Sequence, residues 1–132
     1  GTEDDYVKGE QLARKMFAPI LNAHRITVEQ MAILEPAMAE TVILTCMSVI
    51  KESVEEAIRH GVPREVAYDF ALGHMRVTLG MLFNFIDAEA SDGAKLAMRR
   101  GKEAIFQSDW KKVFEPESVL EQVKAIVEAR QA

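Results

Sequence analysis

The sequence predicts an all-α protein of five or six helices, and three observations support this fold class. Apolar residues recur at spacings of three and four along most of the chain, which is the helical period. No segment alternates apolar and polar residues between turn residues, as a half-buried strand would. Of the 132 residues, 48% are apolar and 28% are charged, which is typical of a globular protein. We therefore expect a single helical domain over residues 1–132.

The first helix is predicted from Asp4 to about Leu21. Leu12, Met16 and Ile20 form an apolar stripe at a spacing of four residues, which gives this helix one face to bury. Gly9 lowers the helix propensity of the first half by about 1 kcal/mol relative to alanine. The second half is therefore expected to be the stronger part of the helix.

A second helix is predicted to begin at Thr27. Thr27 and Gln30 have the spacing of a capping box, in which each side chain bonds the backbone N–H of the other residue. We expect this helix to end near Glu35, because a residue that precedes proline is disfavoured in helical backbone. Pro36 suits the first turn of a following helix, where its missing N–H is not needed. The chain is thus expected to change direction at Pro36.

The helix that starts at Pro36 is predicted to run to His60 and to be the central helix. Gly61 is the residue type expected to end a helix in left-handed backbone, and Pro63 restarts the chain. Between Val42 and Ile50 the remaining faces are also apolar or small, so we expect this part to be surrounded by its own domain or by a partner subunit. The main apolar stripe consists of Ala39, Ile43, Cys46, Ile50, Val54 and Ala57.

Three further helices and one short turn are predicted in the second half. Gly73 and Gly80 lie seven residues apart on nearly one helix face, where a missing side chain lets another backbone come close. Ser91 is the expected cap of a shorter helix, and Ser108 the expected cap of one turn around Trp110. The three helices are predicted from Pro63 to about Ile86, from Ser91 to about Arg100, and from Pro116 to about Ala129.

Charge and motif content exclude several classes of function. The net charge is −5 and the cations are not concentrated on one segment, so no nucleic-acid partner is expected. No G-x-G pattern occurs, which excludes a dinucleotide fingerprint and a phosphate-binding loop within this sequence. No metal-binding motif occurs either. The most apolar run, Phe70 to Ile86, is short for a bilayer span, and nothing resembles a signal peptide. We expect a cytoplasmic protein with no membrane partner.

Two histidines are candidates for chemistry. His74 lies in an apolar helix beside Gly73, where an imidazole either hydrogen-bonds inside the core or faces a pocket. His24 lies on a predicted loop, where it is either solvated or in contact with a ligand.

Three acidic residues are the remaining candidates. Glu35 and Glu40 straddle Pro36, so they flank either a cleft or a plain corner. Asp92 follows the predicted Ser91 cap and serves either the helix start or a ligand. The residues alone leave both alternatives open in each case.

Four stretches together resemble a known family of helical domains. In chain order they are "HRITVEQMAILEPAMAET", "ALGHMRVTLGMLF", "SDGAK" and "DWKKVFEPESV". They resemble the C-terminal domain of bacterial oxidoreductases related to 6-phosphogluconate dehydrogenase and the 3-hydroxyacid dehydrogenases. The match runs from about Met16 to Val123, and it depends on the order and spacing of the motifs together.

The resemblance implies the helical half of a two-domain enzyme. A preceding Rossmann domain would bind NAD or NADP, and the helical domain alone would bind no cofactor. The helical domain would supply part of the cleft for a hydroxy acid or sugar acid and the interface of a homodimer. His74, in the "GH" pair, becomes the leading candidate for substrate binding or proton transfer, followed by Glu35 and Glu40. His24 and Asp92 are the implied substrate contacts.

One departure from the family pattern affects the catalytic assignment. The better-known 3-hydroxyacid dehydrogenases carry a catalytic lysine in a G-x-x-G-x-G-x-x-x-K-x-x-N stretch, and no such stretch occurs here. A histidine or a glutamate is then expected in place of that lysine. The alternative reading of the whole sequence is a free-standing, dimeric helical interaction module without catalysis, in which His74 is a core residue and Pro36 marks only a corner.

Overall fold

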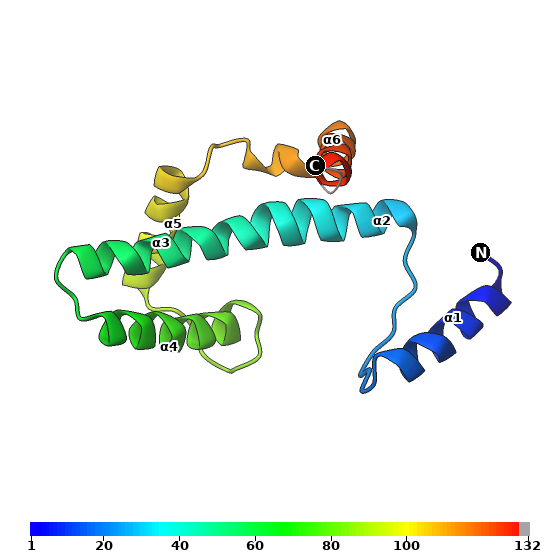
Figure 1. The fold of residues 1–132 in the computed structure, drawn as a ribbon. Coiled ribbons are helices and arrows are strands. Elements are labelled where there is room, and N and C mark those ends of the chain that lie inside the picture. Colours follow the sequence, from blue (N-terminus) through cyan, green and yellow to red (C-terminus); the bar gives the residue numbers. More distant parts are fainter. Residues whose placement is uncertain (130–132) are drawn as a thin grey trace.

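The computed structural model describes residues 1–129 and contains only helices within them, which confirms the all-α prediction (Figure 1). Three of the elements join end to end into one continuous helix, Val28–Arg59. The elements are α1 (Glu3–Met16), α2 (Val28–Ala32), the π-helix η1 (Ile33–Leu44), α3 (Thr45–Arg59), α4 (Arg64–Leu82), α5 (Asp92–Ile105), the 3-10 helix η2 (Trp110–Phe114) and α6 (Pro116–Ala129).

The long helix begins as predicted but does not break at Pro36. Thr27 and Gln30 form the capping box, with the Gln30 N–H donating to Thr27 Oγ1 at 3.2 Å. The expected end near Glu35 is wrong, because the chain continues through Pro36 as π-helix. In α-helical geometry Pro36 would lose one hydrogen bond and its ring would clash with the preceding turn. In a π-helix each backbone N–H donates to the carbonyl five residues earlier instead of four. This wider turn accommodates the proline.

The α3 end of the long helix packs against α4. His60 caps α3 and Gly61 follows with φ of +94°, as predicted for a left-handed terminator. Val54 on α3 and Ala67 on α4 are buried between the two helices. On the rim, Tyr68 Oη donates to Glu55 Oε1 at 2.7 Å, a carboxylate that also pairs with Arg64. The hydroxyl's bond to this carboxylate raises the pKa of Tyr68 above its ordinary value.

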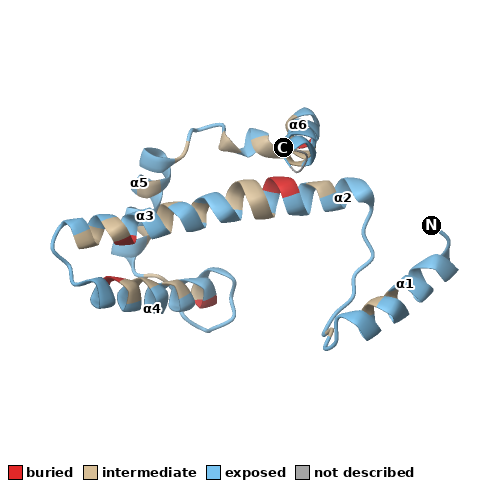
Figure 2. Cartoon of the chain, in the orientation of Figure 1, coloured by how far each residue is buried: buried red, intermediate tan, exposed pale blue. Residues whose placement is uncertain are grey.

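The other end of the long helix packs against α6 and η2, and it holds the remaining part of the core (Figure 2). Pro36 and Ala37 on η1 and Val119 on α6 are buried there. Gln122 connects three elements: its Oε1 accepts from Thr41 Oγ1 at 2.5 Å, and its Nε2 donates to the Val113 carbonyl at 2.7 Å. This shared amide ties α6 to both η1 and η2.

Several predicted boundaries shift for local reasons. The first helix ends at Met16 instead of Leu21, with Pro19 two residues beyond the Phe17 cap and unable to donate an N–H. The helix predicted from Pro63 ends at Leu82 instead of Ile86, because Asn84 adopts left-handed backbone with φ of 57°.

The second half shows three further differences from prediction. The helix capped by Ser91 runs on to Ile105 instead of Arg100. The N-cap residue of the turn at Trp110 is Asp109 and not Ser108, and no side chain caps this turn. The tryptophan ring lies between Phe106, at 5.9 Å between ring centroids, and Phe114, at 6.4 Å.

The two glycines predicted to allow close backbone approach behave differently. A Cβ on Gly80 would lie 3.1 Å from the Ile86 side chain, so this glycine accommodates the loop that follows its own helix. A Cβ on Gly73 would meet nothing within 4 Å. No other helix of residues 1–129 approaches the chain at Gly73.

The chain is open and exposes much more surface than a globular protein of its size. Its accessible surface is 11217 Å², whereas a folded monomer of 14.8 kDa exposes about 7,000 Å². Within residues 1–129, no Cα atom of α1 or α5 lies within 8 Å of another helix, and Ala94 and Met98 of α5 line a hollow together with Met81 and Leu82 of α4. The helix Val28–Arg59 is long and apolar enough to cross a membrane by length and composition alone, as core helices of globular proteins also are. The absence of a membrane partner stays a prediction.

Candidate functional site

His74 lies on the exposed side of α4 and not in the interior. Its ring stacks on the ring of Phe70, one helical turn earlier, with centroids 4.1 Å apart and planes 30° apart. Phe70 is itself 65% exposed. The described residues of this chain do not bury His74, and both rings are free to line a surface that a second body would close.

The hydrogen bond of His74 defines which ring nitrogen is free. Nδ1 lies 3.1 Å from the carbonyl oxygen of Phe70. A carbonyl can only accept, so Nδ1 carries the proton and Nε2 of the neutral ring has an open lone pair. A backbone carbonyl thus holds the imidazole in the tautomer that a general base requires.

Glu35 and Glu40 both lie on η1, on opposite sides of Pro36. Glu35 is exposed and Glu40 is half-buried. In a π-helix the backbone bonds connect residues five apart, so residues at this spacing lie one turn apart, whereas in an α-helix they would point in different directions. The π geometry therefore brings the two carboxylates nearer to one face than the sequence pattern suggests.

The structure does not bring His74 and the two glutamates together within one chain. Among residues 1–129, η1 packs on α2, α3, α6 and η2, and no residue of α4 approaches it. The glutamates lie on the η1 part of the long helix, whereas His74 lies on α4, which packs against the α3 part.

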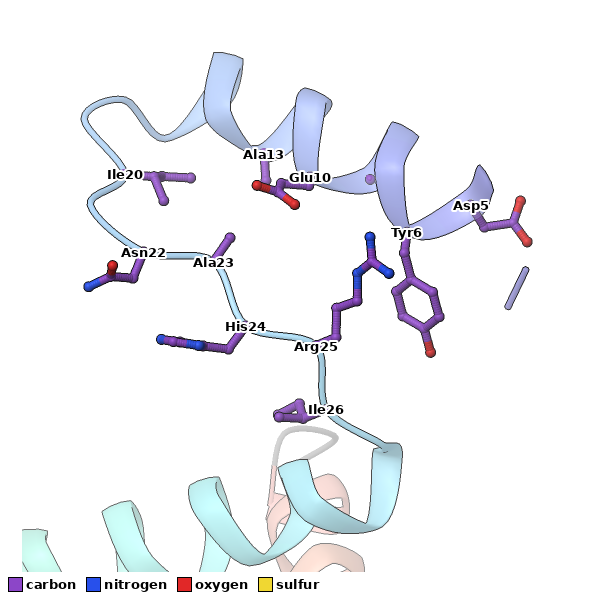
Figure 3. A pocket seen from close by; sticks show the side chains of 11 residues that line it. Asp5, Tyr6, Glu10, Ala13, Ile20, Asn22, Ala23, His24, Arg25 and Ile26 are labelled. Atoms are coloured by element: carbon purple, nitrogen blue, oxygen red, sulfur yellow. The ribbon is translucent and has the colours of Figure 1, made fainter. Parts of the chain in front are cut away.

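His24 lies in the segment that connects α1 to the long helix, where it lines a hollow of about 430 Å³ (Figure 3). Most charges around this hollow are paired with one another. Arg25 donates to both carboxylate oxygens of Glu3 at 2.6 Å, and Arg14 contacts Glu10 at 2.8 Å. The bonded Glu3 carboxylate raises the pKa of Arg25. His24 is exposed and makes no hydrogen bond to the other described residues.

Asp92 is the first residue of α5, after the Ser91 cap whose Oγ accepts from the Ala94 N–H at 3.2 Å. An acidic side chain at this place stabilises the positive end of the helix dipole. Asp92 is exposed, and no Cα atom of its helix lies within 8 Å of α4 or η1. Its position fits the cap role first.

A feature that the sequence did not indicate is an apolar groove of about 480 Å³ between the start of the long helix and α6. The groove forms because two distant segments pack side by side without filling the space between them, and only the contact between these segments could have revealed it. No cluster of three or more potential metal ligands occurs within residues 1–129. The groove is lined by Val28, Glu29, Ala32, Ile33, Phe114, Pro116, Val119, Leu120 and Val123.

Comparison with known proteins identifies the fold. Residues 1–127 match the family described as the C-terminal domain of phosphogluconate dehydrogenase (decarboxylating). The chain thus has the fold of the helical C-terminal domain found in NAD-binding, dehydrogenase-like proteins. It belongs to this phosphogluconate dehydrogenase C-terminal family, which confirms the resemblance of its motifs.

The relatives extend beyond this chain. The chain is 41% identical over 126 residues to a D-apionate oxidoisomerase of Cupriavidus necator and 40% identical to one of Rhizobium rhizogenes, covering 96% of the chain and 46% of each relative. A crystal structure of a semialdehyde dehydrogenase NAD-binding protein from Cupriavidus necator, in complex with calcium and NAD, superposes with a TM-score of 0.92 at 41% identity, covering 96% of this chain and 46% of that one. The chain therefore spans about half the length of these relatives.

Proposed function

We propose that this chain is the substrate-binding and dimerisation half of an NAD(P)-dependent oxidoreductase that acts on a hydroxy acid or sugar acid of the D-apionate type. The observation that carries the proposal is the 41% identity over 96% of the chain to a D-apionate oxidoisomerase. The order of helices and the open surface of the chain agree with a domain that closes a cleft against a second body.

The cofactor site belongs, in this proposal, to a preceding Rossmann domain. A dinucleotide binds where a glycine-rich turn follows a parallel strand. Residues 1–129 form no strand, and their helix starts lack a glycine-rich turn, so they do not fit a dinucleotide. The partial coverage of the relatives supports a further domain, and the apolar residues exposed on α1 offer it a surface. The choice between NAD and NADP lies in that domain, and we place the protein in the cytoplasm.

His74 is the proposed general base of the reaction. Oxidation of an alcohol requires a base within hydrogen-bond reach of the hydroxyl proton. Nε2 of His74 has the free lone pair for this proton, because Nδ1 is bonded to the Phe70 carbonyl. The stacked Phe70 ring supports the imidazole and gives the carbon skeleton of a sugar acid an apolar wall.

Glu35, Glu40, Asp92 and His24 are the proposed polar contacts of the substrate. The two glutamates lie five residues apart on η1 and suit hydrogen bonds to hydroxyl groups of a polyol chain. Since η1 and α4 do not meet within one chain, a site that uses both needs surfaces from outside this chain. A homodimer and the preceding domain are the two sources that we propose.

The test is dehydrogenase activity of the protein as its gene encodes it, with D-apionate and related sugar acids as substrates and NAD and NADP as oxidants. His74→Ala should lower kcat about 100- to 10,000-fold, the usual contribution of a general base. The melting temperature should hardly change, because His74 is exposed and packs only on Phe70.

The matched control is His60→Ala, an exposed histidine at the end of α3 whose imidazole contacts Glu56 at 3.1 Å. This variant should keep full activity. A His74→Ala enzyme with normal turnover would remove the proposed base. Absence of any dehydrogenase activity in the wild type would instead favour the non-catalytic interaction module.

A further inference from the structure

A hollow of about 470 Å³ lies between the end of α4, the loop that follows it and the start of α5. The loop begins with the left-handed backbone of Asn84, and it turns back from the end of α4 to reach α5 (Figure 1). Met81, Leu82 and Met98 give the hollow apolar walls, and alanines of the loop and of α5 leave space between them. This hollow differs from the apolar groove beside α6, because cationic side chains also line it.

The charged residues of the hollow are Lys95 and Arg99 on α5 and Glu89 on the loop. Residues four apart on a helix are neighbours on its surface, so the two cations share one face of α5. Lys95 Nζ donates to Glu89 Oε2 at 2.8 Å. Arg99 makes no hydrogen bond and no ion pair with another of the residues 1–129. The cations of the hollow therefore outnumber its carboxylate, and the Arg99 guanidinium is available to a ligand.

The site residues of the proposed function lack a partner for the charge of their substrate. A sugar acid is an anion at neutral pH, because carboxyl groups ionise near about pH 4. Glu35, Glu40 and Asp92 are carboxylates themselves, and like charges across a binding site cost affinity. Neither His24 nor His74 carries a permanent positive charge. The substrate carboxylate therefore needs a cation that is not among these five residues.

We propose that the hollow between α4 and α5 binds the carboxylate of the substrate, with Arg99 as its principal partner and Lys95 as its second. This inference rests on the proposed function and names the residues that select acids over neutral sugars. A guanidinium binds a carboxylate through two parallel N–H···O bonds, which give orientation as well as affinity. The apolar walls beside the two cations lower the local dielectric, and this strengthens an ion pair.

The hollow lies on the same side of α4 as the proposed base. Met81 follows His74 by seven residues, so both side chains lie on nearly one face of the helix. Val77 lies between them on this face and is 53% exposed, which leaves the face open to a ligand. The axial distance from His74 to Met81 is about 10 Å. An extended arginine side chain and the carbon chain of a sugar acid together bridge this distance, so one substrate can reach both His74 and Arg99.

Two other cations near the candidate residues are less suited to this role. Arg25, on the segment that connects α1 to the long helix, already donates to both carboxylate oxygens of Glu3. Arg76 follows His74 by two residues, and residues at this spacing do not share a helix face. Arg99 combines a guanidinium without a partner in residues 1–129 with a place in a hollow on the His74 side of α4.

The experiment compares D-apionate with its carboxamide, which has the same carbon skeleton without the charge, as substrates of the full protein. Arg99→Gln should raise the KM of the acid about 10- to 100-fold, the usual effect of losing a hydrogen bond to a charged group. The kcat and the KM of the amide should hardly change, because the variant removes binding energy that only the carboxylate receives. Arg99→Lys keeps the charge and should bind the acid more tightly than Arg99→Gln does.

Arg100→Gln is the matched control, because Arg100 is the next residue of α5 but does not line the hollow. It should leave both KM values unchanged. Glu89→Gln should act in the opposite direction and lower the KM of the acid about two- to five-fold, since it removes the carboxylate that competes for Lys95. A variant that only disturbed the fold would not bind the acid more tightly. An unchanged or higher KM in Glu89→Gln would overturn the contact at Lys95.

Calorimetric titration of D-apionate without an oxidant separates this inference from the proposed function. A wild type that binds the acid through Arg99 but oxidises no substrate would overturn the enzymatic proposal and keep the binding site. An active wild type whose KM for the acid is unchanged in Arg99→Gln would keep the enzyme and overturn the site. Equal effects of Arg99→Gln and Arg100→Gln, or a larger effect of Arg76→Gln, would also overturn it. A wild type that neither binds nor oxidises the acid would overturn both proposals.

Discussion

The helices α5 and α6, both in the second half of the chain, differ in how they are stabilised. α6 is anchored, with Val119 buried against the long helix and Gln122 hydrogen-bonded to Thr41 and Val113. α5 is equally long, but within residues 1–129 none of its Cα atoms lies within 8 Å of another helix. The difference shows that the described chain builds its core at the two ends of the long helix and leaves the middle of that helix exposed.

The largest expected effect comes from a variant that disrupts the buried contact of α6 with the long helix. Val119→Asp buries a charge without a partner and should lower the free energy of unfolding by about 3 kcal/mol or more. Denaturant titration followed by circular dichroism measures the change. Val7→Asp, on an exposed position of α1, is the control and should stay within about 0.5 kcal/mol. Equal effects of both variants would mean that α6 is no better anchored than α1.

A second variant tests the hydrogen bonds of the anchored side. Gln122→Ala leaves the Thr41 hydroxyl and the Val113 carbonyl without their partner and should cost about 2 kcal/mol in the free energy of unfolding. Gln11→Ala on exposed α1 should cost nothing measurable. A Gln122→Ala protein as stable as wild type would show that side chains other than Gln122 hold α6 in place.

A smaller effect is expected at the α3–α4 end. Tyr68→Phe removes the hydroxyl that donates to Glu55 at 2.7 Å and should lower the melting temperature less than Gln122→Ala does. Glu55 keeps its pair with Arg64 in this variant, which limits the loss. A loss as large as that of Gln122→Ala would make the two ends of the long helix equally dependent on polar contacts.

The smallest effect is expected next to α5. Lys95 bonds Glu89 at 2.8 Å and holds the pKa of this carboxyl below its ordinary value of 4.5. Because the pKa is lower in the folded protein, the contact contributes stability above pH 4.5 and loses it as the pH falls through the folded pKa. Both groups are exposed, so Glu89→Gln should change the melting temperature only slightly at neutral pH and not at all in acid.

The parts of the fold that could be predicted from sequence are those with local causes. The Thr27 capping box, the Gly61 terminator and the start of the last helix at Pro116 follow from short-range backbone chemistry, and all three are confirmed. The break at Pro36 was predicted from the same chemistry and is wrong, because a π-helix accommodates the proline. The rule that a residue before proline ends a helix does not consider that the helix can continue with π-helical hydrogen bonds.

The candidate site could be predicted only as a set of residues. The resemblance selected His74, Glu35 and Glu40, but their separation depends on which surfaces close around the long helix, and this is not encoded in local spacing. The apolar character between Val42 and Ile50 did indicate a surrounded segment. The chain itself does not surround it, since Leu44 is 64% exposed.

The position of Trp110 has a practical consequence. It is the single tryptophan of the sequence, and it stands at the joint between the unpaired helix and the anchored one, with Phe106 on one side and Phe114 on the other. Its fluorescence is therefore an intrinsic reporter of that joint. Emission followed during dilution or ligand titration should register when α5 changes its surroundings, without any attached dye.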